Sequence, residues 1–84
     1  MSQKDKLIAR LLSKPIDFTF AEATSLLKHL GYSVVKAGAT SGSRIAFVNE
    51  SGDYIRFHRP HPSSVLKHYQ VEDLISTLRE RGAL

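Results

Sequence analysis

The pattern of apolar and polar positions predicts two helices in the first third of the chain. Residues 3–13 carry the apolar pairs of "LIARLL" four residues apart, a spacing typical of a helix with one apolar stripe, and Pro15 limits this helix. A second helix is expected to begin after Thr19, because Thr19 and Glu22 match a capping box. Gly31 then supplies the left-handed residue that commonly ends a helix.

Three short runs with strand character follow, and another helix lies near the end of the sequence. "YSVVK" (32–36) is rich in β-branched residues, whereas "RIAFVN" (44–49) and "DYIRFH" (53–58) alternate between apolar and polar positions. The apolar residues that these two alternating runs direct to one face are Ile45, Phe47, Ile55 and Phe57. Residues 59–69 are predicted to form a loop. A helix is expected over about 70–81, where apolar residues recur at Val71, Leu74, Ile75 and Leu78.

The turn between the two alternating runs sets their register. Glu50-Ser51-Gly52 fits a three-residue hairpin loop whose last residue is left-handed, so Asn49 should oppose Asp53. The apolar faces then coincide, and a slip by one residue would bring core positions opposite surface positions. The predicted pairs are Phe47 with Ile55, Ile45 with Phe57, Val48 with Tyr54, Ala46 with Arg56, and Arg44 with His58.

These elements predict an α+β fold in one domain that spans residues 1–84. Its order is helix, helix, three strands, helix, and the helices pack on the Ile45/Phe47/Ile55/Phe57 face of an antiparallel sheet. The opposite face is left open, and it collects Tyr54, Arg56 and His58 together with Arg44 from the neighbouring strand.

Composition narrows the classes of function. The chain has 84 residues, with 12 Lys and Arg against 8 Asp and Glu, and a formal net charge of +4. Such a balance is typical of proteins that bind phosphate backbones or an acidic partner. The absence of cysteine excludes disulfides, zinc–thiolate sites and thiol nucleophiles. No apolar stretch is long enough for a membrane span and the N-terminus does not resemble a signal peptide, so a cytoplasmic protein is expected.

The open face carries the candidate chemistry. Arg44 and Arg56 could bind phosphate, since guanidinium groups do so in a bidentate way, and His58 could transfer protons near neutral pH. RNA cleavage requires both kinds of group: a base for the 2′-hydroxyl and cations for the developing phosphorane. His61 is a candidate second acid/base that would protonate the leaving 5′-oxygen. The alternative is a solvated polar strand face followed by an ordinary loop histidine.

Other basic residues are weaker candidates. Arg59 and Lys67 could contact the RNA backbone, Lys67 near the start of the last helix, or could lie on the surface without a role. A metal site built from His58, His61 and His68 is disfavoured by their spacing across a Pro-stiffened loop, so neither a metal nor another cofactor is expected.

Four segments in this order resemble the HicA-type toxins, or mRNA interferases, of bacterial toxin–antitoxin systems. The resemblance covers residues 20–84 and rests on "LLKHLGYSVVKAG", "GSRIAF", "FHRPHP" and "LRERGAL", with residues 3–13 as an extra N-terminal helix. It implies a fold similar to a double-stranded-RNA-binding domain. It also implies a ribonuclease that acts on mRNA and is neutralised by a HicB-type antitoxin.

One residue departs from the pattern of this family. The usual motif is Gly-Ser-His followed shortly by Phe, and its histidine is the expected catalytic residue. Gly42, Ser43 and Phe47 match, but Arg44 occupies the histidine position. A guanidinium does not deprotonate near neutral pH and cannot act as a general base. We therefore expect His58, the predicted cross-strand partner of Arg44, to act as acid/base in an endoribonuclease. The alternative is a non-catalytic RNA-binding or protein-interaction domain.

Overall fold

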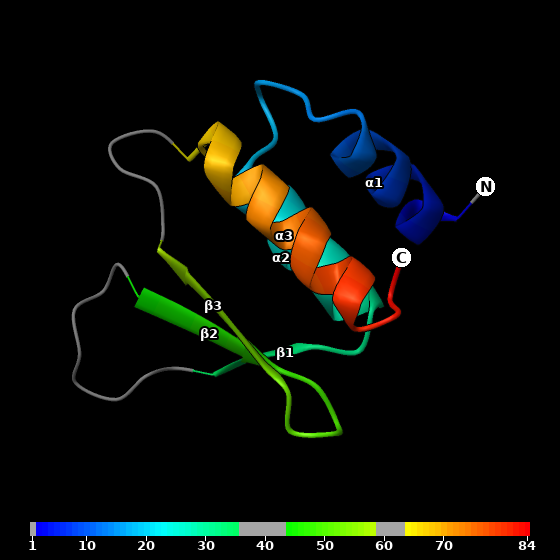
Figure 1. Cartoon of the computed structure of the whole chain (residues 1–84), viewed down its shortest axis with the longest axis vertical. Coiled ribbons are helices and arrows are strands. Elements are labelled where there is room, and N and C mark those ends of the chain that lie inside the picture. Colours follow the sequence, from blue (N-terminus) through cyan, green and yellow to red (C-terminus); the bar gives the residue numbers. More distant parts are fainter. Residues whose placement is uncertain (1, 36–43, 59–63) are drawn as a thin grey trace.

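A computed structural model describes residues 2–35, 44–58 and 64–84, and over these residues it contains three α-helices and one three-stranded antiparallel sheet (Figure 1). The elements are α1 (Gln3–Leu12), α2 (Phe20–His29), β1 (Ser33–Val35), β2 (Arg44–Val48), β3 (Tyr54–His58) and α3 (His68–Glu80). The predicted α+β fold, with its helix–strand–strand–strand–helix order after an extra N-terminal helix, is confirmed.

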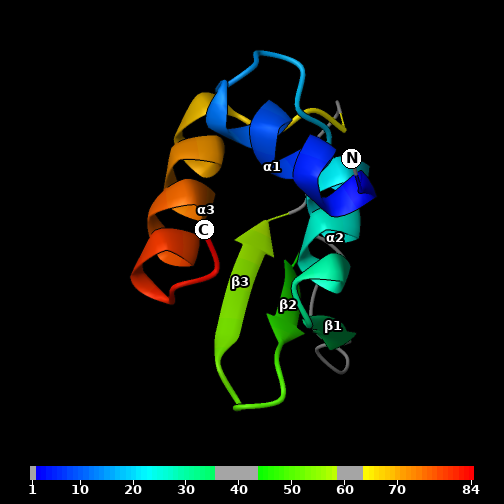
Figure 2. The same ribbon diagram turned by 90° about the vertical axis from the view of Figure 1, so that its right-hand side faces the viewer.

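The helices form layers on one side of the sheet. The strands lie in the order β1-β2-β3, and α2 and α3 cover the face that carries Phe47, Ile55 and Phe57. Helix α1 packs on α2 and α3, on the side away from the strands (Figure 2). The central core side chains are fully buried, among them Phe18, Leu26, Phe47 and Leu78. Burial of this apolar surface is the main driving force for the fold.

The β2–β3 hairpin has the register that the turn predicts. Gly52 adopts a positive φ of 85°, and its N–H donates to the Asn49 carbonyl at 3.1 Å. Asn49 N–H donates to the Asp53 carbonyl at 3.1 Å, and the pairs continue to Arg44 opposite His58. Along β3 exposed and buried residues alternate, so one face belongs to the core and the other to the surface.

The helix ends agree with the sequence signals except at the start of α3. Thr19 and Glu22 form the predicted capping box, and Gly31 has a φ of 93° just after α2. Helix α3, however, begins at His68, so the predicted loop 59–69 was wrong in its last two residues. The reason is the Gln70 side chain, whose Oε1 accepts the Lys67 N–H at 3.0 Å and completes the first turn.

The segments that lead into α2 and α3 are paired with each other. Leu66 N–H donates to the Phe18 carbonyl and Phe20 N–H donates to the Ser64 carbonyl, both at 2.8 Å. Thr19 and Val65 form an isolated antiparallel bridge between these bonds. The contact joins residues far apart in sequence and fixes the start of α3 against the start of α2.

Helix α1 is attached to α2 by charge as well as by apolar contacts. Arg10 donates from Nε to Glu22 and from Nη2 to Asp17 Oδ1 at 3.0 Å. The bond from Arg10 lowers the pKa of the Glu22 carboxyl, while the same bond raises the pKa of Arg10. Glu22 therefore caps α2 and holds α1 with a single carboxylate.

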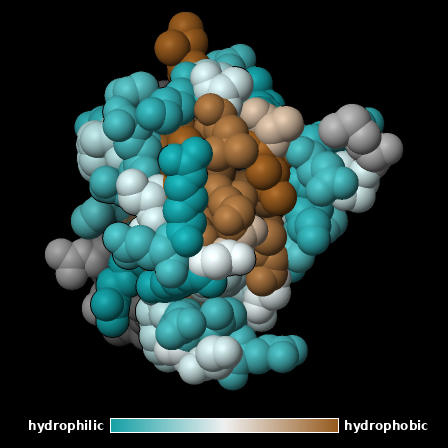
Figure 3. Space-filling view, turned by 45° about the vertical axis from the view of Figure 1, so that its right-hand side comes forward, coloured by the Kyte–Doolittle hydropathy of each residue, from teal (hydrophilic) through white to brown (hydrophobic). Residues whose placement is uncertain are grey.

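The surface on the side of α1 and the C-terminus contains a group of apolar side chains bordered by polar ones (Figure 3). Ile8, Ala83 and Leu84 pack partly buried against the core, and Ile16 is 93% exposed. Within the described residues, no helix is long and apolar enough to cross a membrane.

Candidate active site

The candidate site lies on the outer face of β3, which the helices do not cover. Tyr54, Arg56 and His58 alternate with the buried residues of the strand, and all three are exposed. The Arg56 guanidinium carbon lies 5.8 Å from the centroid of the Tyr54 ring, a cation–π contact that keeps the charge on this face. The structure thus brings Arg56 and His58 to one surface, as predicted.

Arg44 lies directly opposite His58 across the β2–β3 ladder. Asn49 and Asp53 form a hydrogen-bonded pair, and hydrogen-bonded and open pairs alternate along an antiparallel ladder. Counting from this pair makes Arg44–His58 an open pair, in which Cα atoms are roughly 4.5 Å apart and side chains come closest. The backbone of Arg44 belongs to β2, and its side chain lies outside the described part of the structure.

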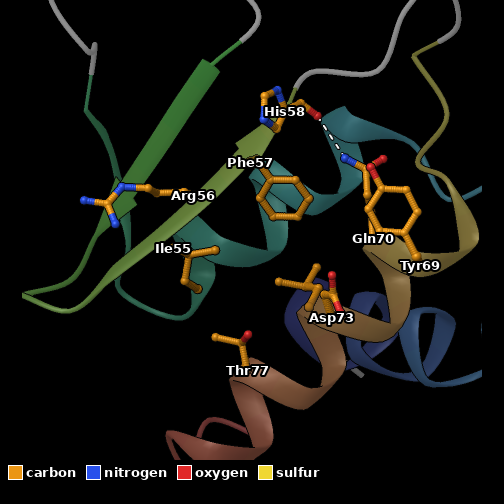
Figure 4. Close-up of a pocket in the computed structure, with 9 residues that line it drawn as sticks. Ile55, Arg56, Phe57, His58, Tyr69, Gln70, Asp73 and Thr77 are labelled. Carbon is orange, nitrogen blue, oxygen red and sulfur yellow. Dashed lines mark hydrogen bonds between the residues drawn. The ribbon is translucent and has the colours of Figure 1, made fainter.

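The same alternation directs the backbone groups of Tyr54, Arg56 and His58 away from β2, toward the free edge of β3. Two side chains bind carbonyls at that edge, one from the first turn of α3 and one from the residue that follows α3. Gln70 Nε2 donates to the His58 carbonyl at 3.0 Å (Figure 4), and Arg81 Nη2 donates to the Tyr54 carbonyl at 2.6 Å. The two ends of the edge strand are therefore fixed to the start of α3 and to the residue after its end.

Gln70 is the residue that connects the candidate site to the fold. Its side chain amide is buried, with 7% of the residue exposed, and it bonds to the backbone of both His58 and Lys67. Burying a side-chain amide costs little free energy of folding when both its oxygen and its nitrogen have hydrogen-bond partners. An amide buried with one of these atoms unpaired destabilises the fold. The amide holds the last residue of β3 and the residue before α3 at a fixed separation.

Lys67 is the N-cap residue of α3 and is exposed, which agrees with a surface role for its ammonium group. His58 and Lys67 are thus brought together through Gln70, although only their backbones take part. The other two predicted residues, Arg59 and His61, lie outside the described residues.

The histidines of the described residues lie apart from one another, on β3, α2 and α3. Within residues 2–35, 44–58 and 64–84 no group of three metal-ligating side chains is found. His68 pairs through Nε2 with Glu72 one turn further along α3, so its imidazole already has a partner on its own helix. His29 ends α2 in an exposed position where the helix dipole favours a cation.

A comparison with protein-family models gives a match over most of the chain. Residues 20–81 match the family model described as the HicA toxin of bacterial toxin–antitoxin systems. The chain belongs to the HicA toxin family. Helix α1 lies outside the matched range. No curated protein and no solved structure matches the chain significantly.

Gln70 is the site residue whose role the HicA sequence did not reveal. It stands close to Lys67, for which the sequence predicts a surface position or a contact with the RNA backbone, but Gln70 itself is buried. The one available signal was its place three residues after Lys67, the position from which Gln reaches back to a helix N-cap. Its second bond, to His58, depends on the tertiary arrangement of β3 and α3.

Proposed function

We propose that this HicA chain is an endoribonuclease in which His58 acts as acid/base and Arg44 and Arg56 bind the phosphate. The observation that carries the proposal is the pairing of Arg44 with His58, beside Arg56 on the same exposed face. Because the usual family histidine corresponds to Arg44, the imidazole of His58 takes over its work from the adjacent strand.

The chemistry is phosphoryl transfer within the RNA chain. Neutral His58 removes the proton from a 2′-hydroxyl, and the 2′-oxygen attacks the adjacent phosphorus. The guanidinium groups stabilise the charge that develops on the phosphorane oxygens, because they remain cationic and present several donors. The bond to the 5′-oxygen breaks, His61 gives that oxygen a proton, and a 2′,3′-cyclic phosphate is left. Arg59 and Lys67 bind neighbouring phosphates, and no metal takes part.

The proposed partner is a HicB-type antitoxin. The chain carries a formal net charge of +4, and its exposed face holds Arg56 and His58. An acidic partner that covers this face would block RNA at the same time, since both ligands use the same charges.

The test is cleavage of RNA by purified protein, with and without EDTA. The unmodified protein should cleave in both conditions, and His58→Ala should reduce the rate by at least about 100-fold, as expected for loss of a general base. His29→Ala is the matched control, because it removes an exposed histidine from the end of α2. Equal rates for His58→Ala and the unmodified protein would disprove the assignment.

The second candidate function is binding of RNA without cleavage, and the residue that favours it is Arg44. A chain whose family histidine is replaced by arginine keeps its phosphate contacts and loses its base. Recognition of A-form RNA requires only backbone and 2′-hydroxyl contacts. Retention of intact RNA, with an affinity that falls steeply with salt, would support this function. An interaction domain for protein alone would bind no RNA at any salt concentration.

A further inference from the structure

A pocket of about 200 Å³ lies between the free edge of β3 and helix α3, and His58 forms part of its rim (Figure 4). Its apolar part consists of the buried side chains of Ile55, Phe57 and Leu74. Its polar part comes from α3, where Tyr69, Asp73 and Thr77 follow one another at intervals of four residues and so share one side of the helix.

We propose that this pocket binds one unstacked base of the RNA, next to the phosphate held by the candidate site; the proposal rests on the proposed function. Sequence-specific proteins bind single-stranded RNA by holding its bases on aromatic side chains and bonding their polar edges. The pocket combines an apolar floor with a few polar groups, as ligand sites do. Its volume is below the roughly 300–1,000 Å³ of sites for drug-sized ligands, so it suits a single base.

The charges on the two sides of the pocket favour different parts of the RNA, the phosphate on one side and the base on the other. The Arg56 guanidinium points away from α3, onto the outer face of β3, whereas Asp73 lies on the α3 side of the pocket (Figure 4). An exposed carboxylate repels phosphate, so the RNA backbone follows the Arg56 side. The base attached to it can then turn over the edge of β3, past His58, into the pocket.

Asp73 also determines which base is preferred. An ionised carboxylate only accepts hydrogen bonds, through two oxygens. Guanine offers two adjacent donors on one edge, N1–H and the N2 amino group, and therefore matches both oxygens. The other bases place an acceptor beside each donor, which a carboxylate disfavours. Tyr69, 58% exposed at the rim, supplies an aromatic face that stacks on any base.

The test is binding of short RNAs that cannot be cleaved. Four 2′-O-methyl hexanucleotides, five uridines with G, A, C or U at one central position, are titrated against the full chain. Without a 2′-hydroxyl they stay intact, so the result is independent of cleavage. The unmodified protein should bind the G-containing RNA about tenfold more tightly than the others, which lies within the discrimination expected from a well-formed bidentate pair.

Two variants assign the effect to the pocket. Asp73→Asn should reduce the preference for G to less than about twofold, because its amide presents both a donor and an acceptor. Tyr69→Ala should weaken binding of all four RNAs by about tenfold, in the range for loss of one base stack. Glu80→Gln is the matched control for charge, because it neutralises an exposed acid at the end of α3 outside the pocket lining. It should leave the preference unchanged.

The failures of the two proposals have different signatures. Equal affinity for the four RNAs, or a preference that survives Asp73→Asn, overturns the base pocket even if the protein cleaves RNA. A preference for G that depends on Asp73 supports the pocket even if the protein cleaves nothing. A loss of antitoxin binding by Asp73→Asn, with unchanged discrimination among RNAs, would instead assign the pocket to a protein side chain and overturn the proposal.

Discussion

The two faces of β3 use adjacent residues for opposite purposes. Ile55 and Phe57 point into the core with at most 8% exposure, whereas Tyr54, Arg56 and His58 between and beside them are exposed. Substitutions on the inner face should change the free energy of unfolding, and substitutions on the outer face should change binding of RNA. The comparison shows how a strand of five residues can direct apolar side chains to the core and charged side chains to the surface, because its side chains alternate with a period of two.

The largest effect on stability is expected at Phe57. Its ring makes edge-to-face contacts with Phe20 and Phe47, at centroid distances of 6.2 and 6.3 Å. Phe57→Ala removes these contacts and leaves a cavity, so it should lower the free energy of unfolding by about 3 kcal/mol or more. Urea denaturation measures the change. A loss below about 1 kcal/mol would mean that the inner face contributes less than its burial indicates.

Gln70→Leu tests the connection between the two faces, and a smaller loss of about 1–2 kcal/mol is expected. The variant keeps a similar size but leaves the Lys67 N–H and the His58 carbonyl without their partner. If the amide also positions His58, RNA cleavage should slow in kcat while KM changes little. Leu26→Val, in the core but outside the pocket lining, is the control. An equal change of kcat in both variants at equal loss of stability would reduce Gln70 to a structural role.

Glu22→Gln tests how much the ion pair between Glu22 and Arg10, which lies away from both faces of β3, contributes to stability. It removes the ion pair with Arg10 but keeps an acceptor for the Thr19 N–H, so about 0.5 kcal/mol should be lost at neutral pH. The folded-state pKa of Glu22 is lowered, chiefly by the bond from Arg10. The stabilisation is therefore present above the unfolded pKa and is lost as the pH falls through the folded pKa. Urea denaturation over a series of pH values from 7 downward should show a difference between wild type and variant that disappears as the pH falls through the folded pKa of Glu22.

The smallest effect on stability belongs to Arg56. Its side chain is exposed and contacts the Tyr54 ring, so Arg56→Ala should change the free energy of unfolding by less than about 0.5 kcal/mol. RNA binding should weaken. The slope of the logarithm of the RNA association constant against the logarithm of salt concentration should become shallower by the amount that corresponds to about one phosphate contact. A salt dependence equal to that of the unmodified protein would remove Arg56 from the phosphate site.

The hairpin was predictable because its information is local. Alternation in "RIAFVN" and "DYIRFH" and the turn at Gly52 were sufficient to pair Arg44 with His58, and the structure has that register. Gln70 was not predictable, because its bond to the His58 carbonyl requires α3 to lie along the edge of β3. The start of α3 was misplaced by two residues for a local reason, since Lys67 offers no side-chain cap and the first turn is completed by Gln70 instead.

The Gln70 bonds also have a consequence for local opening of the fold. One side-chain amide holds the Lys67 N–H and the His58 carbonyl, so separation of α3 from the edge of β3 breaks both bonds at once. Amide hydrogen exchange measures the free energy of such local openings residue by residue. Exchange at the Lys67 N–H should therefore report how often the candidate site comes apart while the rest of the protein stays folded.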